Sequence, residues 1–272
     1  MIRWQIHQKA ETASTNLDAR AGGHGDVFVA DFQTAGRGRL DHKWLSPPGA
    51  NLMMSAVLSV AGLSCEAVST FPLVVGLAVV RAVRGLLPAE VARTVLLKWP
   101  NDVLVGGRKV AGILCERDGE RVIVGIGINV KQREFPQEIA KKAISLGSVP
   151  GFPVGAVPSS SLGAVPGFPV GSVPSSSGPV PLVRDAVLAA LNDSYADWRE
   201  RGFAAVYPQV CAVDFLRGQA LAVRQTDEDA QPVRGICRGI QSDGSLLVGD
   251  VRVYAGEAHV EEIVGEACPQ AT

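Results

Sequence analysis

The order of apolar and polar positions along the chain predicts a mixed sheet covered by helices. Five runs rich in β-branched and apolar residues are bounded by Gly, Pro or charged residues, as strands are: 27–33, 51–60, 95–99, 109–115 and 121–130. Residues 66–87 and 183–201 instead place apolar side chains at helical spacing, which predicts two amphipathic helices. The expected fold class is therefore α+β.

The last part of the chain consists of short β-like runs separated by turns such as Ser242-Asp243-Gly244. The runs are 220–224, 233–240, 245–248, 251–254 and 259–263. They predict a small all-β barrel over 213–265, appended to a mixed domain over 1–212.

A tandem duplication interrupts the mixed domain. Residues 146–161 repeat as 162–177 with only Ala/Ser exchanges at two places, and each copy holds three Pro and three Gly. Such a composition forms neither helix nor ladder, and two copies are too few for a solenoid. A tolerated loop expansion is favoured, with a polyproline-type partner-binding stretch as the alternative.

Composition narrows the class of protein. An apolar fraction of 47%, 19% charged residues and a net charge of −1 are ordinary for a globular chain. From residue 213 onward there are five Arg, no Lys and ten Asp or Glu, so the region before it carries +4. A mildly basic front part suits a phosphate-bearing substrate.

The cysteines and the N-terminus indicate a reduced, non-membrane compartment. Five scattered cysteines without a CxxC pair predict neither a disulfide framework nor a zinc site. The longest apolar stretch, 71–80, has roughly half the residues that a bilayer span needs. The charged N-terminus is unlike a signal peptide. We expect a cytoplasmic protein that does not bind a membrane.

The loop Gly36-Arg37-Gly38-Arg39 is the strongest local chemical signal. Its glycines let backbone N–H groups approach an anion, and its arginines offer planar charged groups for carboxylate or phosphate oxygens. Alone, this pattern is also compatible with a solvated turn or an RG-type nucleic-acid contact.

Further blocks accompany that loop in a fixed order. They are Ser14-Thr15-Asn16, Gln33 three residues before Gly36, the stretch 42–52, Lys98-Trp99-Pro100-Asn101-Asp102, Arg108-Lys109-Val110-Ala111-Gly112-Ile113-Leu114 and Gly125-Ile126-Gly127-Ile128-Asn129-Val130. In this order and spacing the set resembles the biotin protein ligase family, across nearly all of residues 1–212 and more loosely in the C-terminal barrel.

The resemblance implies a class II synthetase-like catalytic domain, an SH3-like character for the C-terminal barrel, and a two-step reaction. Biotin and ATP, with Mg²⁺ as the activating ion, give biotinyl-5′-AMP and pyrophosphate. The biotinyl group then passes to a lysine of a biotin carboxyl carrier protein domain, which is the expected partner.

The resemblance also assigns roles to individual residues. Those implied around biotin are Ser14, Thr15, Asn16, Gln33, Gly36, Arg37, Gly38, Arg39, Lys109 and Gly112, of which Lys109, Arg37 and Arg39 are the catalytic candidates. Short hydroxyl and amide side chains suit a ureido ring, which presents one carbonyl and two N–H groups. A helix N-cap is the alternative for the Ser-Thr-Asn block, and a solvated strand end is the alternative for the lysine.

The nucleotide would be held by Trp44, Asn101 and Asn129. The indole is suited to stacking on adenine, and ordinary core packing is its alternative. Asp102 is the candidate for Mg²⁺, or else caps a turn.

Two departures from the family pattern matter. Asp41 stands where a glycine is common, which puts in doubt how the loop closes. The chain starts directly at the ligase domain, so we expect no DNA-binding helix-turn-helix and no DNA partner, while a homodimer stays open. A lipoate or octanoate ligase or transferase of the same fold, and a non-catalytic biotin-binding sensor, are the alternative functions.

Overall fold

The computed structural model describes residues 1–40, 42–154, 178–225 and 231–261. Several features of the sequence lie outside these ranges: Asp41, most of the duplicated stretch (155–177), Cys268 and the end of the predicted 213–265 domain. The predictions made for them are therefore untested.

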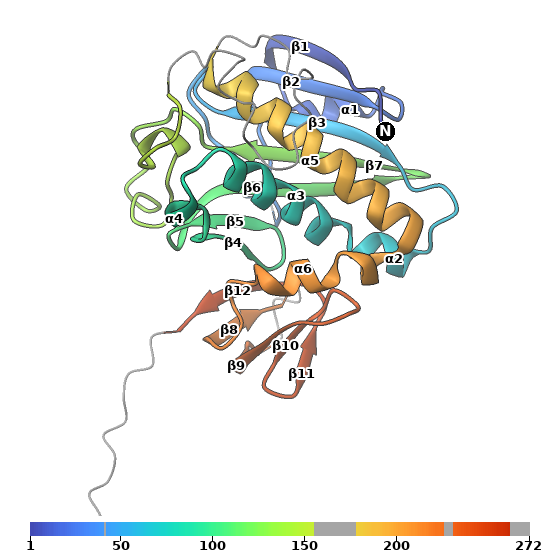
Figure 1. Cartoon of the computed structure of the whole chain (residues 1–272), viewed down its shortest axis with the longest axis vertical. Helices are drawn as coiled ribbons and strands as arrows, with labels where there is room; N and C mark the ends of the chain where they lie inside the picture. The colour runs from blue at the N-terminus through green and yellow to red at the C-terminus, as the bar shows by residue number, and fades with distance from the viewer. Residues whose placement is uncertain (41, 155–177, 226–230, 262–272) are drawn as a thin grey trace, which may run out of the picture.

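Within the described ranges, the first domain is built on a seven-stranded sheet of order β1-β2-β3-β7-β6-β5-β4 (Figure 1). The strands are β1 (Gln5–Thr12), β2 (Asp26–Gln33), β3 (Leu52–Ser59), β4 (Val95–Lys98), β5 (Asp102–Val105), β6 (Arg108–Asp118) and β7 (Arg121–Ile128). Only β1 and β2 run parallel; the other neighbours are antiparallel. The mixed sheet predicted from the sequence is confirmed.

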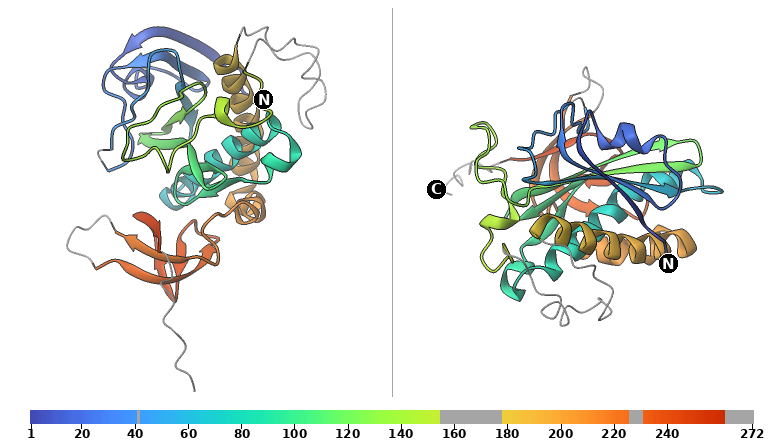
Figure 2. Two further views of the ribbon diagram at one scale, coloured as in Figure 1. Left: turned by 90° about the vertical axis from the view of Figure 1, so that its left-hand side faces the viewer. Right: turned by 90° about the horizontal axis from the view of Figure 1, so that it is seen from above.

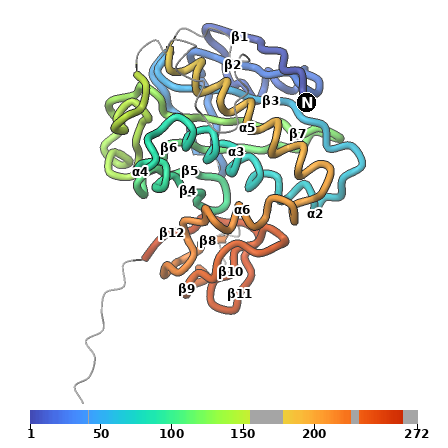
Figure 3. The backbone as a smooth tube through the Cα atoms, viewed as in Figure 1, coloured from blue at the N-terminus to red at the C-terminus, as the bar shows by residue number. Residues whose placement is uncertain are grey.

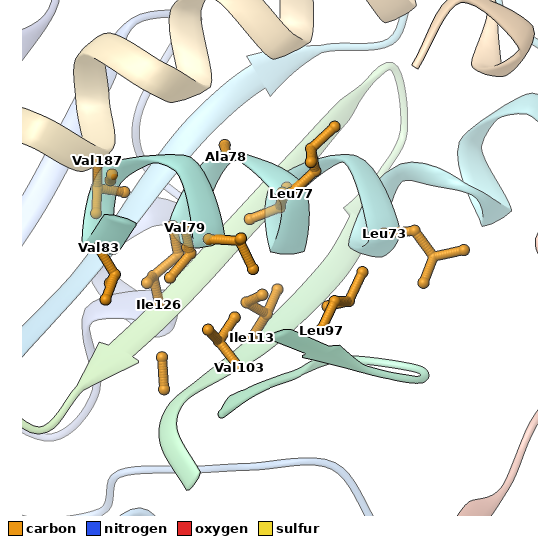
Figure 4. Packing of buried hydrophobic residues seen from close by; sticks show 14 of the residues in the cluster. Leu73, Leu77, Ala78, Val79, Val83, Leu97, Val103, Ile113, Ile126 and Val187 are labelled. Carbon is orange, nitrogen blue, oxygen red and sulfur yellow. The ribbon is translucent and has the colours of Figure 1, made fainter. Parts of the chain in front are cut away.

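Two long helices, α3 (Phe71–Gly85) and α5 (Pro179–Arg201), pack together over one face of this sheet (Figures 1 and 2). Alternate strand residues point into that layer, and Figure 4 shows Leu97, Val103, Ile113 and Ile126 below the apolar side of α3. Because strand side chains alternate between faces, the residues between these point to the other side of the sheet. The site lies on that other side.

The predicted helix over 66–87 is divided into α2 (Cys65–Ser69) and α3 in the structure. Pro72 stands at the start of α3 and has no N–H to continue the α2 ladder, so the helix is interrupted at Thr70. The Thr70 hydroxyl donates to the Ala67 carbonyl at 2.7 Å and closes the last turn of α2.

The segment Cys65–Gly85 meets the length and composition of a membrane-crossing helix, with a mean hydropathy of 1.6 over its most apolar window. However, 67% of that window is buried inside the protein. Packing against the sheet and α5 accounts for its apolar character.

Short or exposed elements were not predicted from the pattern. They are β1, β5, α4 (Ala89–Ala92), α6 (Tyr207–Ala212) and the single 3₁₀ turns η1 (Leu146–Ser148) and η3 (Phe203–Ala205), whereas α1 (Thr15–Ala19) begins where the N-cap alternative placed a helix. Strand β1 lies at the sheet edge and is largely exposed, so it lacks the apolar alternation of a half-buried strand.

The C-terminal part forms a second, antiparallel sheet of order β11-β10-β9-β8-β12 in the described residues (Figure 3). Its strands β8 (Ala220–Arg224), β9 (Val233–Ile240), β10 (Leu246–Val248), β11 (Val251–Val253) and β12 (Glu257–Val260) follow the predicted runs closely. The SH3-like barrel and the boundary at residue 213 stay predictions.

The second sheet is attached to the edge of the first. Leu97 of β4 donates its N–H to the Val213 carbonyl at 2.8 Å and accepts from the Phe215 N–H at 2.9 Å. The Trp99 indole N–H donates to the Gly244 carbonyl at 3.0 Å. These bonds place β12 beside the open face of the large sheet.

Phe71→Ala tests the core that supports this arrangement. The Phe71 ring is fully buried and stacks on Trp198 with ring centroids 4.5 Å apart. The free energy of unfolding, measured by urea denaturation, is expected to fall by about 3–5 kcal/mol. The control Val251→Ala removes methyl groups from a side chain that is 50% exposed and is expected to cost under about 0.5 kcal/mol. Equal losses in the two variants would contradict the prediction.

Candidate functional site

The floor of the site is a patch of bare backbone on the face of the sheet opposite α3 and α5. Gly112 of β6 pairs directly with Gly127 of β7, and Gly125 lies two residues before Gly127 on the same face. A Cβ on Gly127 would lie 2.5 Å from the Trp44 ring, and a Cβ on Gly125 would overlap the Asn16 amide. Glycine is therefore needed at both positions for the side chains above them to approach the sheet.

An open cavity of about 730 Å³ lies above this floor. It brings together nearly all the predicted site residues: Ser14, Thr15, Asn16, Gln33, Arg37, Gly38, Arg39, Trp44, Asn101, Asp102, Lys109, Gly112 and Asn129. Gly36 does not line the cavity, and a Cβ on it would lie 2.5 Å from the Trp44 carbonyl oxygen. Such a volume is within the usual range for small-molecule sites.

One end of the cavity is a cluster of buried polar groups at the start of α1. Ser14, Thr15 and Asn16 are 3–4% exposed. The Thr15 backbone N–H donates to Gln33 Oε1 at 2.7 Å, and the Thr15 hydroxyl lies 3.1 Å from the same oxygen. Ser14 occupies the N-cap position of α1, but its side chain makes no capping bond. The N-cap alternative is thus correct about where the helix begins, but not about a capping hydrogen bond from the Ser14 side chain.

Two polar residues that the sequence analysis missed complete this cluster. The Ser55 hydroxyl, fully buried on β3, lies 2.6 Å from Asn16 Oδ1 and 2.7 Å from Thr15 Oγ1. Glu116 on β6 accepts from Asn16 Nδ2 at 2.5 Å and from Arg37 Nη2 at 3.3 Å. A lone Ser inside the apolar run of β3 was a readable signal for such a contact.

Lys109 lies beside the glycine floor because strand β6 contains a bulge. Val103 pairs with Ala111 but the next residue, Leu104, pairs with Lys109, so Val110 is an extra residue. The bulge turns Lys109 to the same face as Gly112, which strict alternation would forbid. The lysine Cε is 3.3 Å from the Cβ position of Gly112, and its Nζ is 2.7 Å from Asp102 Oδ1.

A second lysine, Lys98, lines the cavity and was not singled out from the sequence. It pairs with Asp102 across the β4–β5 hairpin. Burial lowers the pKa of the Lys98 ammonium, and the Asp102 carboxylate acts in the opposite direction. Lys98, Lys109 and Arg39 together make this end of the cavity cationic, with Asp102 and Glu257 as the nearby anions.

The glycine–arginine loop reaches across to the second sheet. Arg39 Nη1 donates to the Gly256 carbonyl at 3.3 Å, and His42 Nε2 lies 3.1 Å from Glu257 Oε1. Burial lowers the pKa of the Arg39 guanidinium, while Glu257 and Asp102 oppose that shift. The C-terminal part therefore supplies part of the cavity wall.

Trp44 lies inside the cavity and not in the apolar core. Its ring rests on Gly112 and Gly127, with Lys109 Nζ 6.0 Å from the ring centroid. Its buried indole N–H has no hydrogen-bond partner within the described chain. Core packing is thus wrong for this residue, while stacking on adenine stays a prediction.

Asn101 and Asn129 hold the walls of the cavity. Asn101 Nδ2 donates to the Ile113 carbonyl at 2.7 Å, and Asn129 Nδ2 donates to the Ile144 carbonyl at 3.2 Å. Both amides retain an oxygen for a further contact. Among the described residues, no group of three or more His, Cys, Asp or Glu side chains is arranged to hold a metal ion.

Comparison with known proteins agrees with this geometry. Residues 6–132 match the model of the biotin/lipoate A/B protein ligase family. The chain is 40% identical over 148 residues to the biotin–[acetyl-CoA-carboxylase] ligase of Mycobacterium tuberculosis, covering 52% of this chain and 54% of that protein. It is 40% identical over 134 residues to the bifunctional ligase/repressor BirA of Bacillus subtilis, covering 47% and 40%. The matches span about half or less of these relatives.

Solved structures extend the likeness to the whole fold. The biotin protein ligase from Aquifex aeolicus in complex with biotin and ATP superposes with a TM-score of 0.73 at 26% identity, covering 94% of this chain and 98% of that one. The Leishmania major enzyme in complex with biotinyl-5-AMP gives 0.60 at 26% identity, with the same coverage. Together with the matched sequence blocks and the cavity, these likenesses show that residues 6–132 are similar to the biotin/lipoate A/B protein ligase family and that the chain has the fold of solved biotin protein ligases.

Proposed function

We propose that the protein is an ATP-dependent biotin ligase that forms biotinyl-5′-AMP and transfers biotin to a lysine of a carrier domain. The observation that carries this proposal is the position of Lys109. It stands on the glycine floor and forms the cationic part of the cavity with Lys98 and Arg39, and the buried polar cluster of Thr15, Asn16 and Gln33 lines the same cavity. Solved relatives hold biotin with ATP, or biotinyl-5-AMP.

The polar cluster suits the ureido ring of biotin. Thr15, Asn16 and Ser55 are almost fully buried, so an apolar ligand head would exclude water from the hydrogen-bonding capacity that their mutual contacts leave over, without replacing it. An unpaired buried polar group costs roughly 1–3 kcal/mol. A ring with one carbonyl and two N–H groups pairs with such a cluster, whereas the aliphatic chain of octanoate does not. This supports biotin over the lipoate and octanoate alternatives.

The cationic end suits the reacting anions. In the first step a biotin carboxylate oxygen bonds to the α-phosphorus of ATP while the bond to pyrophosphate breaks. Two anions must approach each other for this to happen, and the Lys109 ammonium between them offsets their repulsion. In the second step the acceptor lysine amine attacks the biotinyl carbonyl carbon, AMP leaves with the bonding electrons, and the amine loses a proton.

Asp102 fits a supporting role for Mg²⁺ that arrives with ATP. One carboxylate oxygen is held by Lys109 and the other is available, and Mg²⁺ keeps most of its ligands as water and phosphate oxygens. When bound, the ion would neutralise phosphate charge. The turn-capping alternative for Asp102 has less support, because the carboxylate contacts Lys109 across the hairpin.

The partner proposed is a biotin carboxyl carrier protein domain, by analogy with the relatives named as acetyl-CoA-carboxylase ligases. A cytoplasmic location, a homodimer and the lack of a DNA partner stay predictions. A sensor without turnover is disfavoured, because Lys109 and both loop arginines line the cavity.

Lys109→Ala tests the proposed function. Wild-type protein is expected to release pyrophosphate with biotin and not with lipoate, and the variant is expected to lose about 10²-fold or more of that rate. Arg108→Ala is the control, since the adjacent side chain is exposed and does not line the cavity. Wild-type activity only with lipoate would overturn the choice of substrate, and wild-type rates in Lys109→Ala would overturn the role of the lysine.

Arg39→Gly tests whether the loop retains the adenylate. Without the guanidinium and its bond to Gly256, we expect biotinyl-5′-AMP to escape and to label lysines of bystander proteins. The measurement is biotin incorporation into serum albumin beside a carrier domain, with Arg108→Ala as the control. Labelling confined to the carrier lysine in Arg39→Gly would show that the loop does not gate the intermediate.

A further inference from the structure

Glu116 is an acidic side chain that contacts two residues of the cavity lining, Asn16 and Arg37. It lies on β6, four residues after Gly112 and on the same face, and its side chain is 26% exposed. Its carboxylate contacts Asn16 Nδ2 at 2.5 Å, Arg37 Nη2 at 3.3 Å and Arg20 Nη2 at 3.8 Å. The carboxylate therefore binds the amide of a residue, Asn16, that is almost fully buried.

The first consequence of this contact is a fixed amide orientation. A carboxylate accepts hydrogen bonds and donates none, so the Asn16 NH₂ group must face Glu116. The Asn16 oxygen must then face the Ser55 hydroxyl, which lies 2.6 Å away. A Cβ on Gly125 would overlap this amide, so the bare strand beneath leaves the room that this placement needs.

The second consequence follows from counting hydroxyl protons. Each hydroxyl donates one proton, and Asn16 Oδ1 can only accept, so the Ser55 proton is committed to Asn16. The 2.7 Å contact between the Ser55 and Thr15 oxygens therefore uses the Thr15 proton. The longer 3.1 Å approach of Thr15 Oγ1 to Gln33 Oε1 is left without one, and the Thr15 backbone N–H binds that oxygen instead.

We propose that Glu116 is a positioning residue that fixes the direction of the hydrogen bonds running from Thr15 through Ser55 to Asn16. With its proton directed at Ser55, the Thr15 hydroxyl presents only a lone pair to the cavity. The site then selects a ligand that donates an N–H there, as a ureido ring does. This inference rests on the proposed biotin ligase function and names the group that gives the polar cluster its donor and acceptor pattern.

Three variants of two residues separate this role from a charge effect on Arg37. Glu116→Ala removes the acceptor for Asn16 and the partner of Arg37 together. Glu116→Gln keeps an amide oxygen for Asn16 but removes the negative charge. Ser55→Ala breaks the hydrogen-bond series while leaving Glu116 and Arg37 in place. Asp118→Asn is the control, because Asp118 lies further along β6 and pairs with Arg121 at the hairpin.

The measurements are the dissociation constant of biotin, by titration calorimetry without ATP, and the KM for ATP in pyrophosphate release. One mispaired buried polar group corresponds to about a tenfold weaker binding of biotin in Glu116→Ala. Ser55→Ala is expected to weaken it at least about fivefold. We expect biotin binding by Glu116→Gln and Asp118→Asn within about threefold of the wild type, and KM for ATP within about twofold in all variants.

The possible outcomes separate a failure of the role proposed for Glu116 from a failure of the proposed biotin ligase function. If Glu116→Gln weakens biotin as much as Glu116→Ala does, Glu116 acts through its charge and the proposal is overturned. Biotin affinity near that of the wild type in Ser55→Ala also overturns it, and this variant decides the matter should Glu116→Ala not fold. If the wild-type protein itself binds no biotin and releases no pyrophosphate, the proposed function fails instead.

Discussion

The constraint on which the site depends is that one sheet serves two opposite purposes on its two faces. The face below α3 and α5 is filled with branched apolar side chains, which hold the strands in register. The other face carries glycines at the paired positions Gly112 and Gly127, so a ring can lie flat on the backbone there. The packed face makes the sheet rigid, and the bare backbone of the other face leaves space for the cavity.

The chemistry of the cavity is arranged along this floor as a gradient of polarity. Buried hydroxyl and amide groups stand at the end nearest α1, supported by the Glu116–Arg37 ion pair, and Lys98 and Lys109 stand at the other. A ligand with a polar uncharged head and an anionic tail therefore has one favourable orientation in the cavity. The anionic tail is thus directed to the lysines, because the cationic end does not stabilise the uncharged head and the polar cluster does not stabilise the tail.

Much of this arrangement was predictable, and the exceptions have identifiable physical reasons. Most strands other than β1 and β5, the two long helices and the glycine–arginine loop follow from local patterns, and the ordered blocks predicted the site residues that the cavity brings together. The bulge that turns Lys109 to the glycine face depends on pairing with β5, which strand periodicity cannot show. The contact of Glu116 with Asn16 joins residues a hundred positions apart, and the approach of Glu257 to His42 depends on how the two sheets are attached.

The way in which the second sheet is attached to the first affects the shape of the cavity. Since the loop residues Arg39 and His42 contact Gly256 and Glu257, one wall of the cavity is fixed to a body that is itself held by the edge of β4. The backbone bonds between Leu97 and the segment entering the second sheet, together with the bond from Trp99 to Gly244, fix where the second sheet lies, and they thereby set the width of the cavity above Lys109.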